Sequence, residues 1–136
     1  MIVIDASSIA KYVLKEDGWD KVEIELREES LTIDQALKEV SNAIWKNAII
    51  LRNISIDDAI KRYQILIKMV KEGILTVENE SKYIDKAFNL ALKEQVTVYD
   101  ALYMVQALEN KATLVTSDHN QAQIAKTLGL TVRFIP

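Results

Sequence analysis

Apolar residues follow two different periods along this chain of 136 residues. Ile2 to Ile4 form a short run of β-branched residues within a first strand near 1–5, a pattern typical of a strand buried on both faces. Further strands are predicted near 74–77, 112–116 and 131–135. Elsewhere apolar positions recur every three or four residues, which predicts helices. The predicted helices cover 7–15, 19–29, 34–52, 56–71, 81–94, 98–110 and 119–128.

Strands that alternate with helices of ten or more residues need crossover connections, which make neighbouring strands parallel. We therefore predict an α/β fold with a short parallel sheet of four or five strands flanked by helices. The chain has only three glycines and one proline, and it contains no linker or repeat. Residues 1–136 are expected to form a single domain.

No apolar run approaches the roughly 18–20 residues that span a bilayer, and the first residues do not resemble a signal peptide. We expect no membrane association and a cytoplasmic location. Cysteine is absent and histidine occurs once, which excludes thiolate chemistry and any site with several histidines. The 20 Asp and Glu residues remain as reactive groups. The net charge of −3 argues, by itself, against a nucleic-acid binder that relies on broad positive charge.

Four acids stand apart from the surface charges. Asp5 and Asp118 each follow a predicted strand and precede a helix, so both carboxylates would share one crevice if the two strands are neighbours. Glu39 and Asp100 lie at the margins of apolar helix stripes. Four clustered carboxylates require a cation between them, and Mg²⁺ or Mn²⁺ suits oxygen ligands. The alternatives are N-caps at Asp5, Asp118 and the Thr97–Asp100 pair, and a surface charge at Glu39.

Four blocks of this sequence resemble the PIN domain, and more narrowly the VapC-type toxins of toxin–antitoxin pairs. The blocks are VIDASSIAKYVLKE, Glu39 to Lys46, VTVYDALYMVQALE and TLVTSD, and the likeness covers essentially the whole chain. The resemblance implies a metal-dependent endoribonuclease with one or two Mg²⁺ or Mn²⁺ ions. It further implies that Asp5, Glu39, Asp100 and Asp118 are the catalytic and metal-binding acids, that RNA is the substrate, that a cognate antitoxin exists, and that the toxin is a homodimer.

Several residues near these acids are candidates for supporting roles. Ser7 and Thr116 are predicted to orient carboxylates by hydrogen bonds, with helix capping and an ordinary strand position as their alternatives. The predicted substrate contacts are Lys11, Asn42, Lys46 and His119. For the lysines a solvated helix charge, and for His119 a simple surface position, are the alternatives. For the aromatic residues Trp45, Tyr99 and Tyr103 we favour core or interface packing, with stacking on bases as the alternative.

Two other functions compete with a ribonuclease. A catalytically degenerate PIN module would serve only as a scaffold that binds RNA or antitoxin, but the four acids are intact. A phosphatase with Asp5 as nucleophile would usually have a second aspartate at position 7, where this chain has Ser7. The apolar surfaces of the helices over 34–52 and 56–71 are candidates for contact with an antitoxin helix or a second protomer. Two divalent ions would change the net charge from −3 to about +1, so RNA binding should depend on metal.

Overall fold

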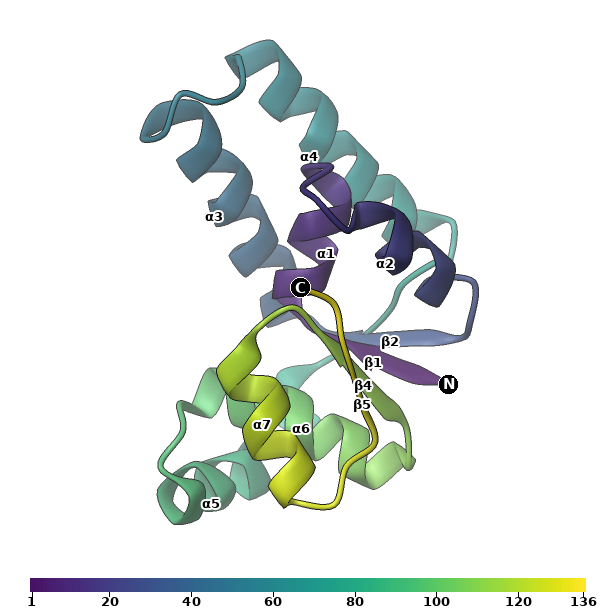
Figure 1. Cartoon of the computed structure of the whole chain (residues 1–136), viewed down its shortest axis with the longest axis vertical. Coiled ribbons are helices and arrows are strands. Elements are labelled where there is room, and N and C mark those ends of the chain that lie inside the picture. The colour runs from purple at the N-terminus through teal and green to yellow at the C-terminus, as the bar shows by residue number, and fades with distance from the viewer.

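A computed structural model describes all 136 residues, and it contains one parallel five-stranded sheet with helices on both sides (Figure 1). The predicted α/β class is confirmed. The strands are β1 (Ile2–Ile4), β2 (Ser30–Ile33), β3 (Thr76–Glu78), β4 (Thr113–Thr116) and β5 (Val132–Phe134). The helices are α1 (Ala6–Val13), α2 (Trp19–Glu25), α3 (Gln35–Ile49), α4 (Ile56–Lys71), α5 (Ile84–Glu94), α6 (Val98–Asn110) and α7 (His119–Thr127), with a 3₁₀ turn over Glu80–Lys82.

The strand order β3-β2-β1-β4-β5 places the first and fourth strands side by side. Ile4 pairs with Val115, and the Asp5 amide continues this ladder by donating to the Val115 carbonyl at 3.2 Å. The chain runs outward from β1 to β2 on one side and from β4 to β5 on the other. Strand order therefore reverses between β1 and β4, and ligands of open α/β sheets bind at this point.

The sequence prediction missed β2, because residues 30–33 fall between the helices predicted over 19–29 and 34–52 and no strand is predicted there. Ser30 and Thr32 interrupt its apolar pattern, yet all four of its residues are buried. Thr32 satisfies its hydroxyl inside the sheet by donating to the Ile4 carbonyl at 2.7 Å. Polar residues that bond to a neighbouring strand can be buried at low cost, but hydropathy alone does not identify them.

The other predicted boundaries need smaller corrections. The helix predicted over 19–29 ends at Glu25, because residues 26–28 turn toward β2. The helix predicted from 81 starts at Ile84, after the 3₁₀ turn. The third strand lies at Thr76–Glu78 instead of 74–77. Helix α4 has the predicted bounds, with the Ser55 side chain accepting from the Asp58 amide at its start.

Helices α1 to α4 lie on one side of the sheet, and α5 to α7 lie on the other (Figure 1). The buried cluster between these layers includes every residue of β1, and each of the three is fully inaccessible to solvent. Helices α3 and α4 pack side by side as a hairpin that extends away from the sheet. None of the helices is both long and apolar enough to cross a membrane.

Candidate active site

Asp5 is the most enclosed of the four acids, with 2% of its surface exposed. Its Oδ1 accepts hydrogen bonds from the Ser7 hydroxyl at 2.6 Å and from the Ser8 amide at 3.1 Å. Its Oδ2 accepts from the hydroxyl of Thr116, at the end of β4. The carboxylate is therefore fixed on both oxygens by α1, which it caps, and by the neighbouring strand.

A second set of bonds joins the ends of β1 and β4. The Ser117 amide donates to the Ser7 hydroxyl at 2.9 Å, and the Asp118 amide donates to the Thr116 hydroxyl at 3.0 Å. Asp118 in turn caps α7, its Oδ1 accepting from the Gln121 amide at 3.0 Å. Ser7 and Thr116 thus both donate to the Asp5 carboxylate, the kind of hydrogen bond expected of them from the sequence, while their hydroxyls accept from the backbone amides of Ser117 and Asp118. Asp118 is exposed, and its Oδ2 forms no hydrogen bond within the protein.

The two helical acids approach from opposite layers. Asp100 lies half-buried in the first turn of α6, where the Thr97 side chain caps the helix by accepting from the Asp100 amide at 3.2 Å. Glu39 lies on α3, and its Oε1 accepts a hydrogen bond from the Tyr103 hydroxyl at 2.9 Å. This bond connects α3 to α6 across residues 64 apart in the sequence.

The four acids are close enough for their negative charges to affect one another's pKa. Burial raises the pKa of Asp5 to about 6, and the nearby charge of Asp118 adds to this rise against the lowering effect of the hydrogen bonds. Burial and the charge of Asp118 raise the pKa of Asp100. Burial and the charge of Asp100 raise the pKa of Glu39, which the Tyr103 hydrogen bond opposes.

No basic side chain neutralises this charge. The ion pairs of the protein involve other acids, and none of the four forms one. Three helices, α1, α6 and α7, instead begin at the cluster, because their first turns contain or adjoin Asp5, Asp100 and Asp118. Their N-terminal dipoles favour negative charge but offset it only partly. Uncompensated oxygen donors are the chemistry that a hard divalent cation satisfies.

The four residues fit such a cation by donor type, because each supplies carboxylate oxygens. No three acid or histidine side chains of the protein lie close enough together to bind a metal ion. Asp100, Glu39 and Asp118 are held less tightly than Asp5, whose two carboxylate oxygens are both hydrogen-bonded. The first three are half-buried or exposed, so their side chains have room to rotate.

The predicted substrate contacts are more scattered. Asn42 and Lys46 are exposed on α3, three and seven residues after Glu39. Lys11 donates to the Asp17 carbonyl at 3.0 Å, in the connection after α1. His119 stacks edge-on against Phe134, with 5.7 Å between the ring centres. The structure therefore groups Asn42 and Lys46 with an acid of the cluster, whereas Lys11 and His119 contact residues outside it.

Sequence reasoning missed three residues that hold the site together. Tyr103 was assigned to packing, and it is buried, but its hydroxyl bonds to Glu39. Gln35 is buried and donates to the Tyr99 carbonyl at 2.8 Å, and Gln121 donates to the Asp100 carbonyl at 3.4 Å. All three have polar groups on buried helix faces, and this is the sequence signal that could have revealed them.

Comparison with known proteins gives a consistent picture. The sequence model of the PIN domain matches residues 2–127. Ribonuclease VapC3 of Pyrobaculum aerophilum is 35% identical over 126 residues, which are 90% of this chain and 92% of that protein. The crystal structure of PAE2754 from the same organism has a TM-score of 0.69 at 24% identity, with 96% of this chain and 82% of that one covered. VapC20 of Mycobacterium tuberculosis, a toxin that cleaves the sarcin–ricin loop, has a TM-score of 0.68 at 13% identity over the full length of both chains. At these identities the two structures show a shared fold.

Proposed function

The chain belongs to the PIN-domain family, and from that premise we propose that it is a metal-dependent endoribonuclease, the toxin of a VapC-type toxin–antitoxin pair. The observation that carries the proposal is the cluster of four acids without a basic partner, at the point where strand order reverses. The relative named ribonuclease VapC3 supports the same activity. We further propose that all 136 residues form one PIN domain, which works in the cytoplasm where its RNA substrate is found.

In this proposal Asp5, Asp100, Glu39 and Asp118 would hold Mg²⁺ or Mn²⁺, as one or two ions. When bound, the metal supplies charge neutralisation for the phosphodiester and lowers the pKa of water. Asp5 is oriented before any ligand arrives, because Ser7 and Thr116 fix its two oxygens. Hydrolysis adds water across the bond and leaves a 5′-phosphate and a 3′-hydroxyl.

The substrate surface is proposed to continue along α3. Asn42 and Lys46 follow Glu39 at helical spacing, and both side chains are free to contact a flanking phosphate. Lys11 and His119 stay as weaker candidates, since each would first give up a contact with Asp17 or Phe134. The exposed Tyr99, next to Asp100, has no partner that would stop it from stacking on a base.

The test is cleavage of RNA with Mg²⁺ or Mn²⁺ by the wild type, Asp5→Asn and Asp100→Asn. Both variants should lose most of the activity, because each removes a charge that the metal needs. Asp34→Asn is a matched control: Asp34 also follows a buried strand, but its Oδ1 accepts from the Glu80 amide at 3.1 Å, outside the cluster. Undiminished cleavage by both cluster variants would overturn the proposed site.

The α3–α4 hairpin offers a surface for the antitoxin. A groove of about 290 Å³ between the two helices is lined almost entirely by apolar side chains, among them Ile44, Trp45, Ile49, Ile56 and Ile60. Trp45 is 52% exposed and Ile56 is 63% exposed, which is unusual for residues of their size. We propose that an amphipathic antitoxin helix covers this groove.

The homodimer is a separate proposal with its own test. Sedimentation of the toxin alone at micromolar concentration should show a dimer, and a lone monomer would contradict it. The competing function, a degenerate PIN module that only binds RNA or antitoxin, is not favoured, because all four acids are present and their charges affect one another's pKa. It would be supported if RNA bound with metal but was never cleaved.

A further inference from the structure

The two largest fully buried side chains of the protein are both tyrosines whose hydroxyls donate to a glutamate. Tyr83 donates to Glu78 Oε1 at 2.7 Å, and Tyr103 donates to Glu39 Oε1 at 2.9 Å. A phenolic hydroxyl in a core needs a partner, so both bonds are expected on structural grounds alone. The surroundings of the two glutamates, however, are very different.

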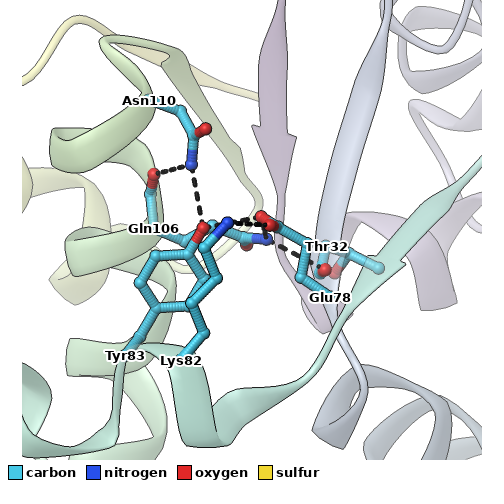
Figure 2. Close-up of polar contacts among 6 residues, drawn as sticks. All are labelled: Thr32, Glu78, Lys82, Tyr83, Gln106 and Asn110. Carbon is cyan, nitrogen blue, oxygen red and sulfur yellow. Dashed lines mark hydrogen bonds and ion pairs between the residues drawn. The ribbon is translucent and has the colours of Figure 1, made fainter.

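Glu78 is a residue of the edge strand β3 and belongs to a polar network that connects this strand to α6 (Figure 2). Its Oε1 also accepts from Gln106 Nε2 at 3.0 Å, and its Oε2 pairs with Lys82 Nζ at 2.7 Å. Asn110 donates to the Tyr83 hydroxyl at 3.1 Å. Both carboxylate oxygens of Glu78 are therefore bonded, and its charge is paired. Neither oxygen of the Glu78 carboxylate is therefore left without a partner.

Glu39 has no such neighbours. The Tyr103 hydroxyl is the one hydrogen-bond donor to its carboxylate, no basic side chain pairs with it, and its Oε2 is unbonded. The neighbouring charge that raises its pKa, after burial, is that of another acid, Asp100. The Tyr103 hydroxyl also lies within electrostatic reach of Asp5. This single neutral donor thus stands inside the acidic cluster, where a positive side chain would compete with a metal.

We propose that Tyr103 is a positioning residue of the active site, which holds Glu39 Oε1 from the buried side so that Oε2 is left for the metal. The inference rests on the proposed function, because it assumes that the cluster binds a divalent ion. A glutamate on an exposed helix face samples many rotamers, and a fixed donor on one oxygen selects those that face the cluster. Tyr103 is well suited to this, since its ring lies on the buried face of α6 and only 1% of the residue's surface is exposed.

The test compares Tyr103→Phe with Tyr83→Phe, which removes the same kind of buried hydrogen bond away from the cluster. Both variants keep the ring, so both should fold and lose some thermal stability. Binding of Mn²⁺ to the full-length protein without RNA, measured by calorimetry, should weaken about tenfold or more in Tyr103→Phe. In Tyr83→Phe it should stay within about twofold of the wild type. Equal Mn²⁺ affinity in the two variants would overturn the inference.

Cleavage kinetics provide a second readout that simple loss of stability would not change. The Tyr103 hydroxyl does not face the RNA in this proposal, so Tyr103→Phe should lower kcat at saturating RNA and leave KM nearly unchanged. Adding Tyr103→Phe to Glu39→Ala should have no further effect on Mn²⁺ binding, because Tyr103 acts through Glu39. A further loss of similar size in the double variant would contradict this route.

One more variant covers the case in which Tyr103→Phe fails to fold. Glu39 is on the exposed face of α3, so Glu39→Asp leaves the core intact. It keeps the charge, but its side chain is one methylene too short to keep the 2.9 Å bond to Tyr103. Mn²⁺ affinity should fall about tenfold, and wild-type affinity would refute the inference. If the wild type itself binds no Mn²⁺, the proposed function fails, and this inference with it.

Discussion

Replacing Asp5 by asparagine should stabilise the metal-free protein, and by more at pH 7 than at pH 5. Burial raises the pKa of Asp5 in the folded protein to about 6, whereas an exposed aspartate has an ordinary value of 3.8. Between these two values the folded state binds more protons than the unfolded state. Stability therefore falls as pH rises from about 4 to about 6, and it is level above that range. Asparagine does not ionise, so it avoids this loss.

The size of the effect follows from the same two values. A shift from 3.8 to about 6 corresponds to about 3 kcal/mol at pH 7, and to about half of that at pH 5. Asparagine keeps a carbonyl oxygen for Ser7 and the Ser8 amide, but its amide group meets the Thr116 hydroxyl in place of Oδ2. A weakened hydrogen bond there costs about 1 kcal/mol. The net gain should thus be about 1–3 kcal/mol at pH 7.

Urea unfolding of both proteins in a chelating buffer, from pH 4 to pH 8, measures this difference directly. Other titrating groups largely cancel between them, so the difference should grow by about 1 kcal/mol from pH 5 to pH 7 and then level off. Asp34→Asn, which removes one charge outside the cluster, corrects for net charge. Saturating Mn²⁺ should stabilise the wild type and not the Asp5→Asn variant. The reasoning is refuted if the difference is independent of pH, or if the variant is less stable by several kcal/mol.

Three further changes test other parts of the molecule. Trp45→Glu should abolish co-purification with the cognate antitoxin, because Trp45 lines the α3–α4 groove. RNA cleavage and thermal stability should stay near wild type, since Trp45 is 52% exposed and outside the acidic cluster. If the variant still co-purifies with the antitoxin, the groove is not the antitoxin-binding surface. Glu78→Ala should lower the free energy of unfolding in urea by about 2–4 kcal/mol, since Tyr83 and Gln106 lose their shared acceptor. Gln95→Gly should raise the free energy of unfolding by up to about 1 kcal/mol, and the melting temperature with it, since Gln95 ends α5 at a φ of 57°, which glycine adopts without strain.

Most of the sheet could be predicted from the sequence. Its strands differ, however, in whether their hydropathy pattern indicates that they are buried. β1 is apolar throughout and buried on both faces, so hydropathy identifies it. β2 is buried just as completely, but Thr32 is satisfied by the Ile4 carbonyl, and its own carbonyl accepts from Gln106 at 3.0 Å. These partners lie 28 and 74 residues away along the chain. No local pattern encodes such bonds, and β2 could therefore be found only from the folded structure.

The same distinction applies to the site. The positions of Asp5 and Asp118 were predictable, because strand ends and helix starts are visible in the sequence and parallel topology brings the two strand ends to one edge of the sheet, while their role in a site stays a prediction. Tyr103 was not, because a tyrosine on an apolar helix stripe has the same pattern whether its hydroxyl faces solvent, backbone or a carboxylate. Its contact with Glu39 depends on how α3 and α6, which lie on opposite sides of the sheet (Figure 1), come together in the fold. Side chains that act across layers are the part of a site that sequence patterns describe least.

Helix capping and metal binding looked like competing explanations of the strand-end aspartates, but in the structure they are compatible. Asp118 caps α7 with Oδ1 alone, so capping orients the carboxylate and leaves Oδ2 without a hydrogen bond. Asp5 caps α1 while Thr116 holds its other oxygen, which places a rigid carboxylate at the base of the cluster. The N-terminal ends of these helices also supply partial positive charge, and this lets the acids approach one another without a lysine or arginine. A basic side chain there would neutralise the cluster permanently, whereas helix ends neutralise it only in part, and the charge that remains is compatible with the proposed metal ion.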